Sequence, residues 1–206
     1  MLRDAAHATS LEREKKHTET SARRSTEPSG FEVVLYPDPI LRRTADPIGR
    51  FDDALRDLVQ AMFARMKKSN GVGLAAPQVG LRQRILVLNP TGDTGDDLAL
   101  VNPTILARAG QKVAYDEGCL SFPGIFAEIV RPDRCKVSAF DPHGNPIETE
   151  FEGFTSRIIQ HEYDHLEGVL LVDRMTPAEK QKHKSALEDL VSRYQRGRAN
   201  AVTRPG

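Results

Sequence analysis

The chain has 206 residues, which is enough for one domain with a sizeable core, whereas a second full domain would be cramped. Lys plus Arg and Asp plus Glu both number 29, so the zero formal net charge gives no general attraction to nucleic acid or to an anionic membrane. With two cysteines, no recognisable apolar leader and no stretch of about 20 apolar residues, we expect a reducing, soluble compartment and no disulfide framework.

Residues 1–30 are charged and contain no aromatic side chain. Such a segment cannot bury enough apolar surface to order itself, so we expect a disordered tail over residues 1–30. Five acidic residues are mixed with its lysines and arginines, whereas organelle transit peptides are poor in acids. We therefore expect a bacterial-type cytoplasmic protein rather than an organellar one.

A single domain is expected over residues 31–196. It opens with alternating Phe31, Val33 and Leu35, which predict a short strand before the turn-forming residues 37–39. Apolar residues then recur at helical spacing from Phe51, with Asp52 or Asp53 as a candidate N-terminal cap. They predict an amphipathic helix that ends near Lys68.

The middle of the chain carries short runs typical of strands, separated by turn clusters rich in Gly, Asp and Asn. Because no helical pattern lies between these runs, their pairing should be mainly antiparallel. The predicted strands are residues 85–88, 98–101, 125–130, 135–140 and 147–151.

Two helices are expected after these strands. The first starts near Thr155 or Ser156 and stops at Gly168. The second opens with residues 176–179, a capping threonine, a first-turn proline and a capping-box glutamate in order, and ends at Gly197 before a flexible tail over residues 197–206. The fold class is α+β, with mainly antiparallel sheets packed around a central helix and flanked by N-terminal and C-terminal helices.

Residues 161–165, HEYDH, give that central helix an H-E-x-x-H motif. Residues four apart on a helix lie on one face, so His161 and His165 can reach one ion while Glu162 borders the site as a general base. A pattern with three fixed positions also occurs by chance on charged helices. The flanking residues are strongly apolar, however, and a metal ion would remove the cost of burying two unpaired imidazoles.

A third protein ligand is needed for a usual hydrolytic metal site. Downstream of the helix the candidates are Glu167, Asp173 and His183, and upstream the candidate is Cys119, which follows a glycine. A lone cysteine is more often a buried core thiol than a ligand. That interpretation suits Cys135, which is in phase with apolar neighbours on one predicted strand face.

Residues 71–76 also satisfy the dinucleotide-binding pattern G-x-G-x-x-A, which is weak alone. They follow a predicted helix rather than a strand, and Pro77 interrupts any helix that the pattern would open. A loop that passes close to a substrate backbone explains these glycines better.

Three segments together resemble the signature motifs of the peptide deformylase family. They are residues 71–80 (GVGLAAPQVG), 117–121 (EGCLS) and 160–165 (QHEYDH), and they stand in the family's order. The chain from about Phe31 to Thr176 is similar to the family, and residues 122–125 (FPGI) resemble its branch found in plant organelles and many bacteria.

The resemblance implies an enzyme that removes the formyl group from N-formylmethionyl nascent peptides, with transient contact to the ribosome. It also implies one divalent transition metal ion, physiologically Fe²⁺, with Zn²⁺, Ni²⁺ or Co²⁺ compatible with the same ligands. The implied metal ligands are Cys119, His161 and His165; the implied acid/base is Glu162; the implied oxyanion donors are Gln78 and the backbone N–H of Leu120.

A methionine side chain needs an apolar slot. Its candidate walls are Gly71, Gly73, Phe126 and Ile158. For Phe126 and Ile158, ordinary core packing is the alternative. Glu117 is expected either to pair with Arg131 and steady the cysteine loop or to be solvated at the surface.

Two other functions use the same residues. A zinc endopeptidase would cleave unformylated peptides and take its third ligand downstream of His165. A non-catalytic metal-stabilised module would bind an ion without turnover, but it gives no reason to retain Glu162 and Gln78.

Overall fold

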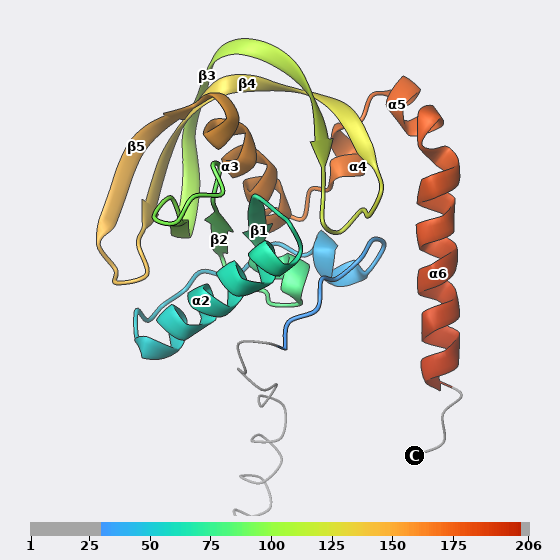
Figure 1. The fold of residues 1–206 in the computed structure, drawn as a ribbon, viewed down its shortest axis with the longest axis horizontal. Helices are drawn as coiled ribbons and strands as arrows, with labels where there is room; N and C mark the ends of the chain where they lie inside the picture. Colours follow the sequence, from blue (N-terminus) through green and yellow to red (C-terminus); the bar gives the residue numbers. More distant parts are fainter. Residues whose placement is uncertain (1–29, 203–206) are drawn as a thin grey trace, which may run out of the picture.

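The computed structural model describes residues 30–202 of the chain, so the tail predicted over residues 1–30 lies outside the described residues except for Gly30. A curved sheet wraps around one helix, a second helix lies below it, and a long helix stands at one side (Figure 1). The elements in chain order are η1 Pro39–Arg42, α2 Asp53–Lys68, β1 Gly73–Ala75, η2 Ala76–Val79, β2 Ile85–Leu88, β3 Leu98–Gly118, β4 Phe126–Phe140, β5 Pro146–Glu152, α3 Gly153–Leu166, α4 Leu171–Arg174, α5 Pro177–Lys182 and α6 Lys184–Val202.

The sheet has five strands in the order β1-β2-β3-β4-β5, and every neighbouring pair is antiparallel, as predicted. The strands predicted over residues 98–101, 125–130 and 135–140 are too short. The first continues to Gly118 as β3, and the other two are one strand, β4. Much of β3 is polar and exposed, and its pairing with β4 contains register shifts, so its residues carry no regular apolar alternation.

Helix α3 lies inside the curve of the sheet (Figure 1). It is buried on almost every side, with Ile158, Ile159 and Leu166 in a core shared with β2 and β4. The expected central helix is therefore confirmed, and its H-E-x-x-H motif lies in the interior. Within the described residues, no helix combines the length and apolar character needed to cross a membrane.

Helix α2 covers a second core, which β1, β2 and the start of β3 complete. The Asp52 side chain caps it by accepting a hydrogen bond from the Leu55 N–H at 3.1 Å, as the sequence predicted. Its inward face is apolar. The buried α2 residues are Leu55, Val59, Ala61, Met62, Phe63 and Met66.

The predicted strand at residues 31–35 is wrong. This segment forms no ladder with another strand. Its backbone hydrogen bonds to other segments are isolated, from Val34 N–H to the Gln78 carbonyl at 2.7 Å and from Tyr36 N–H to the Ser121 carbonyl at 2.9 Å. Leu35 is 43% exposed, so the alternation does not mark a buried face. The turn that follows is present and leads into η1.

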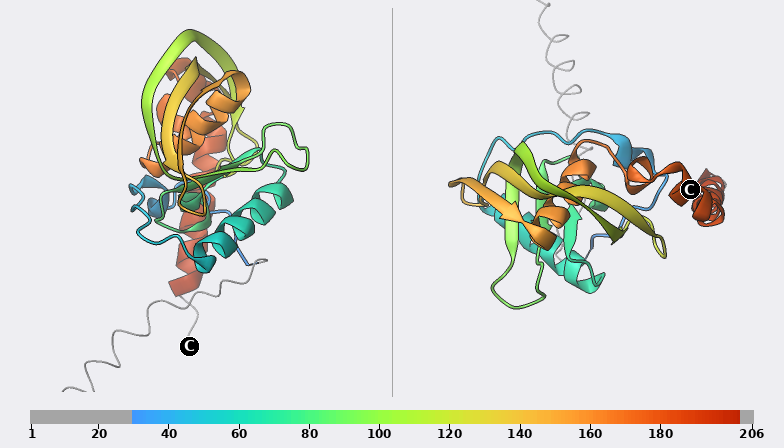
Figure 2. Two further views of the ribbon diagram at one scale, coloured as in Figure 1. Left: turned by 90° about the vertical axis from the view of Figure 1, so that its left-hand side faces the viewer. Right: turned by 90° about the horizontal axis from the view of Figure 1, so that it is seen from above.

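The C-terminal helix predicted from Thr176 is divided at His183 into α5 and α6. Thr176 caps α5 through the Glu179 N–H at 3.2 Å, but the Glu179 carboxylate accepts from the Glu128 N–H at 3.1 Å and so joins α5 to β4. Helix α6 continues through Gly197, where we expected it to end. It stands beside the body in Figure 1 and in the right-hand view of Figure 2.

Replacing Asp52 by Ala should lower the free energy of unfolding by about 1 kcal/mol, because the Leu55 N–H loses its partner at the start of α2. Chemical denaturation of both variants measures this, with Asp57→Ala, an exposed change within the same helix, as the control. Equal stability of the two variants would contradict the capping role.

Candidate active site and metal centre

Helix α3 and the loop after β3 bring three potential metal ligands together. The ligand atoms of Cys119, His161 and His165 all lie within 4.8 Å of one another, and Cys119 Sγ is 3.2 Å from His165 Nε2. Ligand atoms around a tetrahedral ion lie roughly 3.5 Å apart, so the donor set suits a transition metal. In the described part of the chain, this is the one such group of three or more residues.

The downstream ligand candidates lie elsewhere. Glu167 forms an ion pair with Arg84 at 2.6 Å, and Asp173 bonds the Leu170 N–H at 2.7 Å. Cys135 of β4, as expected, is fully buried in the core. The structure therefore gives no support to a third ligand downstream of His165.

A buried carboxylate orients the first histidine. Glu117 Oε2 lies 2.9 Å from His161 Nδ1, which leaves His161 Nε2 for an ion, as is common for metal-binding histidines. Arg131 holds the same carboxylate through two hydrogen bonds of 2.7 and 3.0 Å. Burial raises the pKa of Glu117, but hydrogen bonds from His161 and Arg131 outweigh it and lower this pKa to about 2.

The expected pair of Glu117 and Arg131 is thus confirmed, and the solvated alternative for Glu117 is wrong. The ion pairs extend further than the sequence suggested. Arg131 also binds Asp164 at 2.8 Å, and Arg157 binds Glu117 at 2.7 Å. The sequence patterns did not single out Arg157 or Asp164. Arg157 stands four residues before His161, and Asp164 lies inside the motif itself.

Glu162 lies beside the three ligands with only 5% of its surface exposed. Within the described residues, its Oε2 atom has no hydrogen-bond partner. Burial raises its pKa to about 7, although the nearby His161 opposes this. A carboxyl with such a pKa can accept and release a proton near neutral pH.

The glycine-rich segment packs directly against these groups. A Cβ atom on Gly73 would lie 2.5 Å from Glu162 Oε1 and 2.7 Å from Ile158 Cγ2, and one on Gly71 would lie 2.8 Å from Leu120 Cδ1. Neither position has room for a side chain. Close approach of the backbone, rather than nucleotide binding, therefore accounts for these glycines.

Gln78 presents its amide nitrogen to the site. Its Oε1 accepts from the Ala75 N–H at 2.8 Å, while Nε2 lies 3.6 Å from Cys119 Sγ and 3.5 Å from Ser121 Oγ. The Leu120 N–H donates no hydrogen bond to any described residue. Both donors are thus placed beside the candidate metal ligands, and the backbone donor is free for a substrate oxygen.

A cleft of about 470 Å³ opens onto His161 and Glu162. The predicted walls Gly71, Gly73, Phe126 and Ile158 all line it. Phe126 is 62% exposed, so core packing does not account for it, whereas Ile158 is buried and also belongs to the core.

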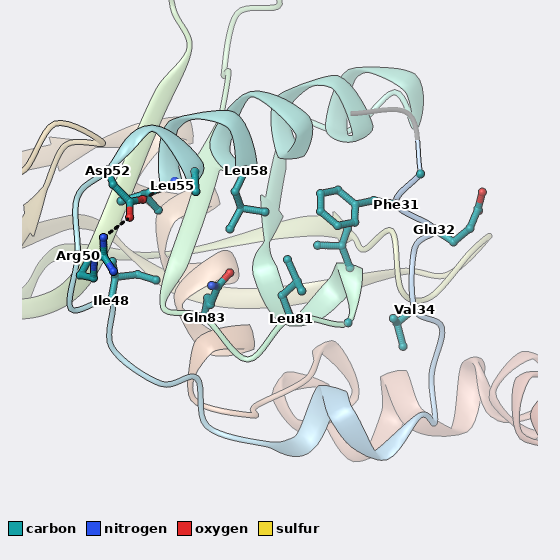
Figure 3. Close-up of a pocket in the computed structure, with 14 residues that line it drawn as sticks. Phe31, Glu32, Val34, Ile48, Arg50, Asp52, Leu55, Leu58, Leu81 and Gln83 are labelled. Atoms are coloured by element: carbon teal, nitrogen blue, oxygen red, sulfur yellow. Dashed lines mark hydrogen bonds and ion pairs between the residues drawn. The ribbon is translucent and has the colours of Figure 1, made fainter. Parts of the chain in front are cut away.

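A second cavity, of about 850 Å³, is larger but lies between the N-terminal segment and α2. Phe31, Leu58 and Leu81 point into it from different elements, and Arg50 pairs with Asp52 at its edge (Figure 3). None of the residues of the candidate metal centre lines it. The chemistry therefore places the active site in the smaller cleft.

Known proteins resemble this chain both in sequence and in structure. The family model for polypeptide deformylase matches residues 31–181. The chain belongs to the polypeptide deformylase family. It is a metal-dependent hydrolase that removes the N-formyl group of nascent peptides during protein synthesis.

Individual relatives of this deformylase come from plants and bacteria. It is 42% identical over 193 residues to the chloroplastic peptide deformylase 1B of Oryza sativa subsp. japonica, covering 93% of this chain and 71% of the relative. It is 41% identical over 167 residues to the peptide deformylase of Thermotoga sp. (strain RQ2). This match covers 81% of this chain and 99% of the relative. The crystal structure of Arabidopsis thaliana peptide deformylase 1B with an inhibitor has a TM-score of 0.78 and 48% identity, covering 81% of this chain and 93% of that one.

The pKa values of the two histidines of the deformylase site are shifted in opposite directions. Burial by itself lowers the pKa of His161, but hydrogen bonds to Cys119 and Glu117 raise it well above its ordinary value. Burial and the nearby His161 lower the pKa of His165 well below its ordinary value. Because a metal-binding imidazole is neutral, an ion at this site competes with the proton that these contacts favour on His161.

Binding of Zn²⁺ to the metal-free protein at pH 7 should release at least one proton, and the apparent affinity should rise with pH. Isothermal titration calorimetry in buffers with different ionisation enthalpies measures the number of protons released. Identical binding heats in all buffers would contradict the protonated state of His161.

Proposed function

We propose that Glu162 is the acid and base of the deformylation reaction and that Cys119, His161 and His165 hold its metal ion. The observation that carries this assignment is the convergence of the three ligand atoms within 4.8 Å, beside a buried carboxyl whose pKa is near 7. A divalent ion bound by these residues would supply Lewis-acid chemistry, lowering the pKa of a water molecule and polarising the formyl oxygen.

In the proposed reaction, Glu162 takes a proton from the water that attacks the formyl carbon. Its carboxyl touches the backbone at Gly73, so it has little freedom to turn away from the cleft. Glu162 then passes the proton to the amine nitrogen as the carbon–nitrogen bond breaks. The products are formate and a free N-terminus.

The formyl oxygen gains negative charge during this attack. We assign its stabilisation to Gln78 Nε2 and to the Leu120 N–H, each donor being worth about 3 kcal/mol in comparable sites. The hydrogen bond between the Ala75 N–H and Gln78 Oε1 supports this role, because it leaves the amide nitrogen facing Cys119 and Ser121.

Selectivity for formylmethionine would come from the shape of the cleft. The formyl carbon carries only hydrogen, so a tight site excludes acetyl groups, and the apolar walls would take the methionine side chain. The proposed walls are Gly71, Gly73, Phe126 and Ile158.

For the ion we propose Fe²⁺, with Zn²⁺, Ni²⁺ or Co²⁺ able to occupy the same donor set of two nitrogens and one sulfur. Nascent chains as substrates imply transient contact with the ribosome.

We propose a cytoplasmic, bacterial-type enzyme. This is supported by the alignment with a bacterial relative, which covers 99% of that relative. A chloroplastic relative has about the same sequence identity to this chain, so the location needs a test of its own. A fluorescent fusion of the full chain, expressed in the native cell, would overturn the proposed location if it entered an organelle.

The test is to incubate anaerobically purified protein with formyl-Met, acetyl-Met and unmodified Met peptides and to measure formate and primary amine. We expect formate and new amine from the formylated peptide alone. Amine from the unmodified peptide would indicate an endopeptidase instead, and bound metal without any product would indicate a non-catalytic module.

Replacing Glu162 by Ala should reduce turnover of the formylated peptide by at least about 10³-fold while one ion per chain stays bound, because the proton carrier is lost and the ligands remain. Elemental analysis and formate release measure the two effects. Cys119→Ala is the comparison variant, since it should lose the bound ion as well as the activity. Near-normal deformylation by the Glu162 variant would show that another group is the base.

A further inference from the structure

Arg157 is a buried cation next to the metal centre that the proposed chemistry does not use. It lies on α3 one helical turn before His161, with 7% of its surface exposed. It lies outside the three segments that carry the family motifs. A buried guanidinium is costly unless all of its donors are engaged, so its partners indicate what it does.

Those partners lie on both long strands. Arg157 Nη1 donates to Glu117 Oε1 at 2.7 Å and to the Ile129 carbonyl at 3.1 Å, and Nη2 donates to the Val113 carbonyl at 2.6 Å. The guanidinium also lies 5.3 Å from the centre of the Tyr115 ring. One side chain of α3 therefore binds β3 and β4 together, in a geometry that the planar fork of arginine favours.

This position matters because the candidate ligands come from two different elements. Cys119 follows β3, whereas His161 and His165 belong to α3. Glu117 lies between the two elements, since it belongs to β3 and bonds the His161 ring. A contact that fixes α3 against Glu117 thus also fixes the distance between the sulfur ligand and the two nitrogen ligands.

We propose that Arg157 is a positioning residue for the metal centre, which joins α3 to β3 and β4 and orients His161 through Glu117. The inference rests on the proposed ligand set. Residues that orient a metal ligand typically change metal affinity 10- to 100-fold when removed. Because Arg157 acts through Glu117, which Arg131 also holds, we expect the lower end of that range.

Arg84 provides a matched control. It too is a largely buried arginine that combines an ion pair, a carbonyl and an aromatic ring: Glu167 Oε1 at 2.6 Å, the Pro103 carbonyl at 3.0 Å and the Tyr163 ring at 5.1 Å. It makes no contact with Glu117. Loss of Arg84 therefore reports what the removal of a largely buried arginine next to α3 does when the bonds of Glu117 are kept.

The experiment compares the full chain with its Arg157→Met, Arg157→Lys and Arg84→Met variants. Zn²⁺ affinity is measured by competition with a chromophoric chelator, and the visible spectrum of the Co²⁺-loaded protein reports ligand geometry. The melting temperature of each metal-free protein is recorded. We expect about tenfold weaker Zn²⁺ binding and a shifted Co²⁺ spectrum for Arg157→Met, and a smaller change of about threefold for Arg157→Lys.

A lower melting temperature for Arg157→Met with wild-type affinity and spectrum would overturn the proposal, because it would leave Arg157 a merely structural role. An equal loss of affinity in Arg84→Met would also overturn it. If Arg157→Met does not fold, Arg157→Lys decides: weaker binding supports the proposal and unchanged binding contradicts it. Absence of a sulfur-to-cobalt charge-transfer band in the wild-type protein would instead refute the ligand set itself.

Discussion

The carboxylate of Glu117 joins the strand that leads to the cysteine ligand with the helix that carries both histidines. It accepts from Arg131 and Arg157 and bonds His161 Nδ1, all within 3.0 Å. Breaking one side of such a buried pair typically costs 3–5 kcal/mol, because it leaves an uncompensated charge. The position of the proposed ion, and with it the proposed chemistry of the cleft, depends on this one buried group.

Glycines are the second feature on which the shape of the cleft depends. They let three segments that are distant in the sequence pack together without side chains between them. Gly71 touches Leu120, Gly73 touches Glu162, and Gly118 leaves room for the Phe126 ring, where a Cβ would lie 2.7 Å from the ring. Each motif of the family thus contributes a surface to the same cleft. The motifs are separate in the sequence and form one contact region in the fold.

The sequence predicted what depends on local pattern and missed what depends on pairing. The cap of α2, the central helix and the strand at residues 85–88 follow from spacing alone. The length of β3 does not, because cross-strand hydrogen bonds extend it through exposed polar residues. For the site, the motifs indicated the ligands and Glu162, whereas the role of Arg157 could not be predicted because its partners lie on β3 and β4.

The central claim is that one ion is held by one sulfur and two imidazole nitrogens at the place where β3 and α3 meet. X-ray absorption of the Zn²⁺-loaded full chain tests this most directly. The account predicts one sulfur at about 2.3 Å and two imidazole nitrogens at about 2.0 to 2.1 Å from the ion. A first shell of nitrogen and oxygen without sulfur would contradict it.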